Sequence, residues 1–374
     1  MAEPASAEVA GPGSGLRVAF FSDATAGRNG TGTYYQDLLA ALGGELAAMA
    51  VFQPEGPDAE ADPSIPLPGD TTQRLGLPRP GRVRARLRQL RPHVVVAATP
   101  GPYGLYGARW ARRLGSGLVS GYHTDFAQLS AMYWGWLGQR LVAAPMRGVQ
   151  ARLLRRSEAV VVMAPEFVPT VRDAGARQVE VVGTPLDPAF LEPPLAAPPT
   201  QIGRVCFVGR LAREKNLESL VQAATDWPGL DFAVAGDGPL RAELEAEAER
   251  LPNLRLLGWL DRAGVRGLID AADLLVLPSH TETFGSIALE AMARGRPPLV
   301  AAAAGIHAWP ELAEGLFRQE PSEPLSAAIG RLRALPAAEL AQAAGRAREL
   351  ACALHRDTVA AWVDLLHRYS RGAA

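Results

Sequence analysis

The sequence predicts an α/β protein built from two doubly wound, Rossmann-like parallel-sheet domains that face a cleft. Short apolar runs alternate with helical patterns along most of the chain, which is typical of βαβ units. The alternation stops in a proline-rich stretch, residues 187–203, and then starts again. The length of 374 residues also favours two cores, because single cores rarely grow beyond about 250–300 residues.

The expected elements follow from apolar periodicity. Before the proline-rich stretch, we expect helices over residues 33–42 and 81–92 and strands over residues 16–22, 93–98, 117–122, 159–163 and 179–182. After it, we expect strands over residues 204–209, 231–236, 254–257, 274–278 and 298–302. The matching helices are expected over residues 216–224, 239–251, 262–271, 286–294 and 337 to about 369. Because doubly wound sheets bind ligands at the carboxyl ends of their strands, functional residues are expected where strands end.

The chain is expected to divide into a tail (1–15), a first domain (16–190), a linker (191–203), a second domain (204–350) and a final helix (351–374). The tail is rich in small residues, glycine and proline and lacks the pattern of a signal peptide, so we expect it to be disordered and the protein to be cytoplasmic. No apolar run is long enough to span a membrane. Cys206 and Cys352 suggest neither a disulfide nor a metal site.

The net charge of −1 conceals a strongly basic region. Between residues 71 and 157 there are 15 arginines and a single acid, Asp125. Such a region attracts anionic surfaces or substrates. No recognition motif accompanies the arginines, so nucleic acid is not an expected partner.

Residues 81–92 carry a narrow apolar stripe, Val83, Leu87 and Leu90, among arginines. The stripe predicts a surface helix that covers the first sheet. A second hypothesis adds peripheral docking of the basic segment 74–91 on the inner, anionic face of a membrane, where each basic residue contributes about 1 kcal/mol. The aromatic residues at 133, 134 and 136 would reach the interface, line an acceptor cleft or belong to the core.

The motif ETFGSIALE, residues 282–290, follows an apolar strand and opens a helix near Gly285. The first N–H groups of a helix have no intrahelical partner and favour phosphate. Glu282 precedes the helix, where it can accept hydrogen bonds from hydroxyls. Glu290 could hold a vicinal diol such as ribose with its two oxygens, or could merely pair with Arg294.

The motif VGRLAREKN, residues 208–216, follows another strand and contains Arg210 and Lys215, the only lysine of the chain. Two cations at a strand end suit a diphosphate. The alternative is a solvated Lys215 that pairs with Glu214 or Glu218. The stretch AGDGP, residues 235–239, indicates only a tight turn.

Together these motifs resemble family 4 of the retaining glycosyltransferases, which have the GT-B fold. The resemblance rests on RLAREKN, AGDGPLRAEL, LGWL, ADLLVLPS and ETFGSIALEAMARGRPPLVA, and is strong from residue 204 to about 305. It implies that the second domain binds a nucleoside diphosphate-sugar and the first receives the acceptor. It also implies that the final helix crosses back onto the first domain.

The resemblance implies roles for particular residues. Arg210 and Lys215 would neutralise the diphosphate, helped by backbone N–H groups at Phe284 and Gly285. Glu282 would contact the donor sugar and Glu290 the ribose.

In the first domain, the segment 22–42 resembles the family's opening strand, glycine loop and helix. This resemblance would place Asn29, Gly30 and Gly32 near the phosphates. A flexible turn explains these three residues equally well. The segment GYHTDF, residues 121–126, resembles one whose histidine contacts the donor sugar, which implies His123, with a structural hydrogen bond as the alternative. Its HTD form resembles bacterial GDP-mannose-dependent α-mannosyltransferases and sulfolipid synthases.

One segment departs from the family pattern. Where the family has Asn-Gly-Val-Asp, this chain has GTPLD, residues 183–187. Whatever that turn contributes to the site is therefore in doubt. The chain also lacks an Asp-x-Asp triplet, so cationic side chains and a helix terminus, and no metal or cofactor, are expected to stabilise the leaving diphosphate.

The resulting hypothesis is a metal-independent, retaining hexosyltransferase. It would use a GDP- or UDP-linked sugar, with mannose as the leading candidate, and act in glycan or glycolipid biosynthesis on an acceptor that is lipid-linked or another glycoconjugate. Two alternatives remain on the same fold. One is a nucleotide-sugar epimerase, and the other is a non-catalytic nucleotide-sugar-binding membrane adaptor.

Overall fold

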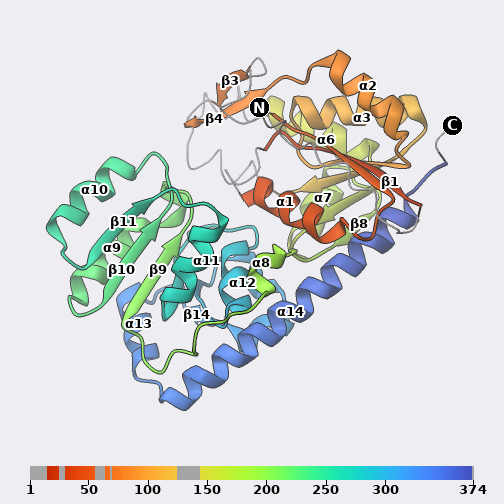
Figure 1. Cartoon of the computed structure of the whole chain (residues 1–374). Helices are drawn as coiled ribbons and strands as arrows, with labels where there is room; N and C mark the ends of the chain where they lie inside the picture. Colours follow the sequence, from red (N-terminus) through yellow and green to blue (C-terminus); the bar gives the residue numbers. More distant parts are fainter. Residues whose placement is uncertain (1–14, 25–29, 55–63, 68–69, 124–143, 373–374) are drawn as a thin grey trace, which may run out of the picture. The chain divides into compact units, whose positions relative to one another are not determined.

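The computed structural model describes residues 15–24, 30–54, 64–67, 70–123 and 144–372. The chain forms two compact units. The first comprises Met1–Pro185 and Asp357–Ala374, and the second is Leu186–Arg356 (Figure 1).

The first unit contains a six-stranded sheet in the order β2-β1-β5-β6-β7-β8, with every neighbouring pair parallel. Its strands are β1 (Arg17–Phe21), β2 (Ala48–Phe52), β5 (Val94–Ala97), β6 (Gly117–Tyr122), β7 (Ala159–Val162) and β8 (Val179–Val181). Its helices are α1 (Gly30–Leu42), α2 (Pro80–Leu90), α3 (Pro102–Leu114), α6 (Ala144–Arg156) and α7 (Phe167–Asp173). A separate antiparallel pair joins β3 (Ser64–Leu67) to β4 (Asp70–Gly76).

The second unit contains a six-stranded parallel sheet in the order β11-β10-β9-β12-β13-β14. Its strands are β9 (Arg204–Val208), β10 (Asp231–Ala235), β11 (Leu254–Gly258), β12 (Leu274–Leu277), β13 (Leu299–Ala301) and β14 (Phe317–Gln319). Its helices are α8 (Pro188–Leu191), α9 (Leu217–Asp226), α10 (Arg241–Arg250), α11 (Arg262–Ala271), α12 (Ser286–Ala293) and α13 (Leu325–Arg333), with 3₁₀ turns η2 (Arg213–Lys215), η3 (Gly305–Ala308) and η4 (Pro310–Gly315). Helix α14 (Ala337–Arg368) begins in this unit and ends in the first.

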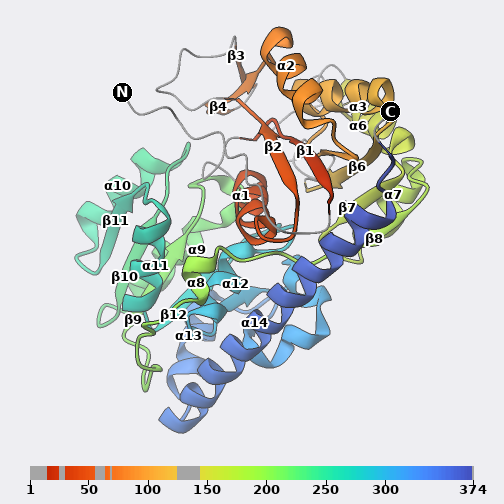
Figure 2. The ribbon, with the colours of Figure 1, turned by 45° about the vertical axis from the view of Figure 1, so that its right-hand side comes forward.

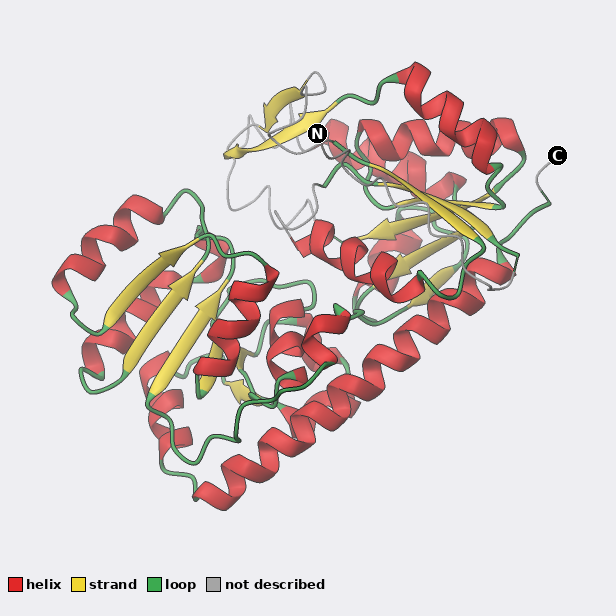
Figure 3. Cartoon of the chain, in the orientation of Figure 1, coloured by secondary structure: helices red, strands yellow, loops and turns green. Residues whose placement is uncertain are grey.

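The predicted fold class is confirmed, because each unit carries a doubly wound parallel sheet with helices on both faces (Figure 3). In the second sheet the strand order reverses at β9. Right-handed crossovers therefore place α9 and α10 on one face and α11 and α12 on the other. The central strands are covered on both sides, and β5 and β12 are buried along their whole length.

The sequence prediction omitted several elements, among them β2, β14, α3 and α13. The strand β14 has only three residues, Phe-Arg-Gln, and no apolar run, so pairing with β13 rather than local pattern creates it. In contrast, the helix predicted over 262–271 has the same bounds in the structure.

The proline-rich segment 187–203 is held against the second unit by arginines. The side chain of Arg294 is 2% exposed, pairs with Asp270 (Nε to Oδ1, 2.7 Å), and donates to the carbonyl oxygens of Glu192 (2.6 Å) and Pro194. Arg348 donates to the carbonyl oxygen of Leu191 (2.9 Å). Because this irregular segment lacks a strand ladder, arginine side chains supply hydrogen-bond donors to its backbone carbonyls. The predicted linker, residues 191–203, therefore lies on a segment that is anchored to the second unit.

The end of α14 packs inside the first unit (Figure 2). Trp362 is fully buried, and its Nε1 donates to the Tyr34 hydroxyl (2.8 Å), which in turn donates to the carbonyl oxygen of Gly183 (3.2 Å). Further along, a Cβ atom on Gly117 would lie 1.8 Å from the carbonyl oxygen of Tyr369. The last residues of the chain therefore follow the beginning of β6 closely. Within the described ranges, no helix has both the length and the apolarity needed to cross a membrane.

Candidate functional site

The switch point of the second sheet lies between β9 and β12, where the strand order reverses. In doubly wound sheets, ligands bind beyond the carboxyl ends of the strands at this point. Arg210 and Lys215 follow β9, and Glu282 and Gly285 follow β12. The sheet order therefore brings four of the predicted site residues to one edge, although 72 residues of sequence separate Arg210 from Glu282.

Lys215 and Glu282 form an ion pair between the Nζ and Oε2 atoms. Their side chains are 16% and 19% exposed, so the pair is screened less than a surface pair. The alternative pairing of Lys215 with Glu214 or Glu218 is wrong, since its partner comes from the other loop. Asn216 strengthens the connection, because its Nδ2 donates to the carbonyl oxygen of Pro278 (3.2 Å).

Arg210 pairs with Glu214, with 3.2 Å between Nη1 and Oε1. Glu214 is 7% exposed, and its backbone carbonyl accepts from the N–H of His280 (2.8 Å). The two cations of the first motif are thus each held by a carboxylate, Arg210 by its own loop and Lys215 by the loop after β12.

The glycine stretch 235–239 has a larger role than the turn predicted from sequence. A Cβ atom on Gly236 would lie 1.8 Å from the carbonyl oxygen of Gly209, and Gly236 has a φ of +144°. Backbone hydrogen bonds from Gly209 to Ala235 (3.0 Å) and from Leu211 to Asp237 (2.9 Å) join the same two loops. The stretch therefore lets two backbones touch and shapes the loop that carries Arg210.

The loop after β12 is fixed by backbone bonds to the loop after β13. The N–H of Gly305 donates to the carbonyl of Glu282, and that of Ile306 donates to the carbonyl of Phe284, both at 2.9 Å. Phe284 is 1% exposed, and its ring meets Trp309 edge-on. The ring of Phe284 is therefore packed within the unit and is not exposed to a ligand.

Helix α12 begins at Ser286, and Gly285 before it has a φ of +100°. A Cβ atom on Gly285 would also come within 2.9 Å of Leu277 Cδ2. The position thus requires glycine on two grounds. The helix start presents its unpaired N–H groups at the same edge as Arg210 and Lys215, which creates a positive environment for an anion.

Glu290 is buried, with 3% exposure, and its partner is Arg262 (Oε1 to Nη1, 2.7 Å). The predicted alternative, a pair with Arg294, is wrong, since Arg294 binds Asp270. Burial raises the pKa of Glu290, and the neighbouring Arg262 opposes that rise. Among the residues that the structure describes, the buried Oε2 atom of Glu290 has no hydrogen-bond partner, so it is the carboxylate oxygen left to accept from a ligand hydroxyl.

Sequence reasoning missed Arg262 and Asp187 as neighbours of Glu290. The Nε atom of Arg262 lies 3.4 Å from Asp187 Oδ2, and Asp187 also caps α8 through the N–H of Ala189 (2.9 Å). Asp187 ends the segment that departs from the family pattern. Although this segment departs from the family pattern, it keeps the carboxylate of Asp187, which positions Arg262, the partner of Glu290.

His123 lies in the first unit, directly after β6, and is 8% exposed. Its Nε2 atom is 2.9 Å from the Tyr35 hydroxyl, and its ring packs against those of Tyr34 and Tyr35. Burial lowers the pKa of His123 to about 3, so the ring is neutral at physiological pH. A neutral ring can orient a sugar hydroxyl but does not act as a cation here.

Gly30 and Gly32 lie in the first turn of α1, and Asn29 is outside the described residues. A Cβ atom on Gly30 would meet nothing within 4 Å, so packing does not require glycine there. The switch point of this sheet, between β1 and β5, holds a feature that the sequence reasoning missed. Asp23 accepts hydrogen bonds from the Thr99 hydroxyl and from the N–H of Tyr103 (2.7 Å).

The basic helix α2 covers the first sheet as predicted. Val83, Leu87 and Leu90 are buried in the core beside Phe52, and the Arg86 guanidinium lies 5.5 Å from the centre of the Phe52 ring. Contact with a membrane stays a prediction. The aromatic residues at 133, 134 and 136 lie outside the described residues.

Two models of known protein families match this chain. A model described as "Glycosyl transferases group 1" matches residues 197–341, and one described as "Glycosyltransferase Family 4" matches residues 28–190. Together the two models cover most of the chain. The division between them falls between residues 190 and 197, in the proline-rich segment.

Among curated proteins, the chain is similar to a GDP-mannose-dependent alpha-mannosyltransferase of Mycolicibacterium smegmatis, with 34% identity over 65% of this chain and 64% of the relative. It is also 27% identical to the sulfoquinovosyl transferase SQD2 of Arabidopsis thaliana over 65% of this chain and 49% of that protein. The chain thus spans less than two thirds of either relative. Among solved structures, sucrose-phosphate synthase from Thermosynechococcus elongatus shares the fold, with a TM-score of 0.72, 20% identity and coverage of 94% and 98% of the two chains.

Proposed function

The chain belongs to the family 4 glycosyltransferases with the GT-B fold, and we propose that it transfers a hexosyl unit from a nucleoside diphosphate-sugar to an acceptor hydroxyl. One observation supports this most directly. The sheet order gathers Arg210, Lys215, Glu282 and the start of α12 at one switch point. Two cations and a helix N-terminus suit a diphosphate, and a carboxylate beside them suits sugar hydroxyls.

During transfer, negative charge develops on the departing diphosphate. Arg210, Lys215 and the first N–H groups of α12 would stabilise that charge without a metal ion or cofactor. Lys215 already binds Glu282, but an ammonium group has three donors, so it can keep this partner and still reach a phosphate oxygen. Glu282 would then be held by Lys215 while it accepts from the sugar.

The nucleoside would extend towards Glu290. One carboxylate oxygen is engaged by Arg262, and the other, which has no partner among the described residues, would accept from a ribose hydroxyl. In the first unit, the neutral ring of His123 would orient the sugar, and Gly30 and Gly32 would lie near the phosphates.

Mannose from GDP-mannose is the leading donor, supported by the similarity to the Mycolicibacterium smegmatis enzyme. A UDP-sugar is the second candidate. The acceptor would be a hydroxyl of a lipid-linked or other glycoconjugate. Membership of the family also supports retention of the anomeric configuration, which the one-bond carbon–proton coupling constant at the product's anomeric carbon would report.

Two substitutions test the site. Glu282→Ala and Lys215→Ala should each abolish transfer while thermal unfolding remains a single transition near that of the wild type. The matched controls are Arg241→Ala and Glu245→Ala, which remove an exposed ion pair of the same unit (2.8 Å) and should leave transfer unchanged. Near-normal transfer by either site variant would reject the assignment. Conversion of the donor without any acceptor would instead indicate an epimerase, and binding without turnover would indicate an adaptor.

The single lysine allows a test that requires no knowledge of the acceptor. An amine-selective acylating reagent can modify only Lys215 and the α-amino group, so the α-amino group serves as an internal reference. GDP should protect Lys215 more than UDP or ADP if the donor is GDP-linked, and Glu282→Gln should speed modification by removing the ion-pair partner. If all three nucleotides leave the rate of Lys215 modification unchanged, the diphosphate does not bind at this switch point.

A further inference from the structure

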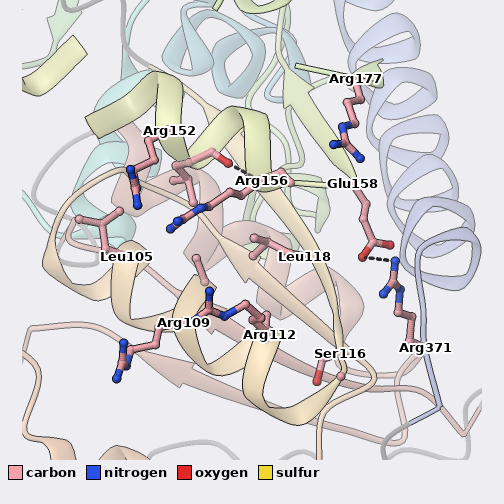
Figure 4. Close-up of a pocket in the computed structure, with 15 residues that line it drawn as sticks. Leu105, Arg109, Arg112, Ser116, Leu118, Arg152, Arg156, Glu158, Arg177 and Arg371 are labelled. Carbon is pink, nitrogen blue, oxygen red and sulfur yellow. Dashed lines mark hydrogen bonds and ion pairs between the residues drawn. The ribbon is translucent and has the colours of Figure 1, made fainter. Parts of the chain in front are cut away.

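A cavity of about 600 Å³ lies in the first unit, beside helices α3 and α6 and the amino ends of β6 and β7 (Figure 4). Its lining includes Gly115, Ser116 and Leu118 at the beginning of β6, and residues 156–158 before β7. The lining of the cavity reaches Leu118 of β6, whereas His123 follows β6 at its carboxyl end, so about four residues of strand, roughly 13 Å, separate the cavity from that edge. The cavity is therefore distinct from the carboxyl edge at which the proposed reaction would involve this unit.

Arginine dominates the lining of the cavity. Six arginines contribute to it, and Figure 4 shows their side chains around the hollow: Arg109, Arg112, Arg152, Arg156, Arg177 and Arg371. The one carboxylate in the lining, Glu158, binds Arg371 (Oε1 to Nη2, 3.0 Å). In the part of the chain that the structure describes, the other five arginines form no ion pair.

The spacing of the arginines directs them to one place. Arg109 and Arg112 are three residues apart on α3, and Arg152 and Arg156 are four apart on α6, so each pair shares a helix face. Arg112 and Arg156 lie in the last turns of their helices, where the helix dipole favours a positive charge, so the dipole explains arginine at these two positions. It does not account for Arg109 and Arg152, which lie one turn earlier, or for Arg177.

Like charges repel, and neither α3 nor α6 contains an acid that would offset the repulsion. The floor of the cavity is apolar, with Ala111, Leu118 and Leu153 buried. A floor of this kind offers no partner to the guanidinium groups. A bound anion would therefore supply the compensation that these two helices do not.

We infer that this cavity binds a ligand that carries clustered phosphate esters. Arginine offers a planar fork that matches phosphate oxygens in pairs, and the five guanidinium groups that have no ion pair with a described residue can engage at least two phosphates. The volume lies within the usual range of small-ligand sites, about 300–1,000 Å³. Two sources share this chemistry, a soluble oligophosphate and the phosphorylated headgroup of a lipid.

Calorimetric titration with tripolyphosphate at physiological salt tests the soluble source. The variant Arg109→Gln/Arg152→Gln removes two exposed, unpaired arginines that do not cap a helix, so its fold should persist. Binding should weaken by about tenfold for each arginine removed. The matched control is Arg255→Gln/Arg356→Gln, which removes the same charge from exposed positions of the second unit, outside both the cavity and the basic segment 74–91, and should change binding by less than about threefold.

Sedimentation with vesicles tests the lipid source, using phosphatidylcholine with and without phosphatidylinositol bisphosphate. Selective loss of either probe in the cavity variant supports the inference and identifies the source. Equal loss of binding in both double variants overturns the inference, because the arginines would then attract anions only through their overall charge. No binding of either probe to the wild type also overturns the inference. Lys215→Ala provides the remaining comparison. Loss of tripolyphosphate in that variant but not in the cavity variant would place the ligand at the proposed donor site and also overturn the inference.

Discussion

The pairing of Arg262 with Glu290 allows a quantitative test of how the second unit holds a buried carboxylate. The substitution Arg262→Met removes the guanidinium that lies 2.7 Å from Glu290 Oε1, while an unbranched side chain can still pack on the Phe190 ring. Glu290 is 3% exposed, so water cannot replace the interaction with Arg262. Removing one partner of a buried ion pair costs about 3–5 kcal/mol.

The loss should depend on pH in a defined direction. Burial raises the pKa of Glu290, and Arg262 is the main opposing influence, so the pKa rises further in the variant. A group whose folded pKa is raised favours the folded state below its unfolded pKa and loses that contribution as pH rises through the folded pKa. The variant should therefore be most destabilised near pH 8 and recover towards wild-type stability near pH 5.

Thermal unfolding followed by circular dichroism measures the effect. For a unit of this size, each kcal/mol shifts the midpoint by about 2–4 °C, so the variant should melt roughly 6–20 °C lower near pH 8. Adding Glu290→Gln should restore most of the loss. Arg241→Met, which breaks an exposed pair, should leave the midpoint nearly unchanged at both pH values. An unchanged midpoint near pH 8, or the same decrease near pH 5, would refute the reasoning.

Two further predictions concern the backbone and the buried histidine. Gly236→Ala places a Cβ atom against the Gly209 carbonyl and should displace the loop that carries Arg210. We expect a loss of more than about 1 kcal/mol in stability and weaker donor binding by calorimetry. Gly229→Ala, whose Cβ meets nothing within 4 Å, is the control that should change neither. Because burial lowers the pKa of His123 to about 3, the stability of the first unit should fall by up to about 1.4 kcal/mol per pH unit as pH decreases below 6.5. Urea unfolding of His123→Asn across that range should show a shallower slope, and a slope equal to that of the wild type would contradict the assignment.

Local pattern predicted most of the fold because the strongest strands are continuous apolar runs. The runs at β5, β7 and β12 are buried throughout, and no competing polar residue obscures them. The pattern failed where an element depends on a neighbour, as β14 does on β13.

For the candidate site, too, local pattern predicted one part, and the other part depends on which strands are neighbours. That Arg210, Lys215 and Glu282 lie where strands end was evident in the sequence, because a strand and the loop after it are adjacent in the chain. Their convergence depends on β9 and β12 being neighbours, which the sheet order decides. The ion pair between Lys215 and Glu282 joins residues 67 apart, and no local signal specifies it.

The sequence by itself determined the fold class, the family and the strand ends that carry the chemistry, since these depend on periodicity and on short motifs. Only the tertiary structure decided which charges meet. Arg262 could be assigned to Glu290, and six arginines between residues 109 and 371 to one cavity, only once the strands were in order. Charge pairing is set by distance in space, and in a parallel sheet that distance depends on crossovers which place residues remote in the chain side by side.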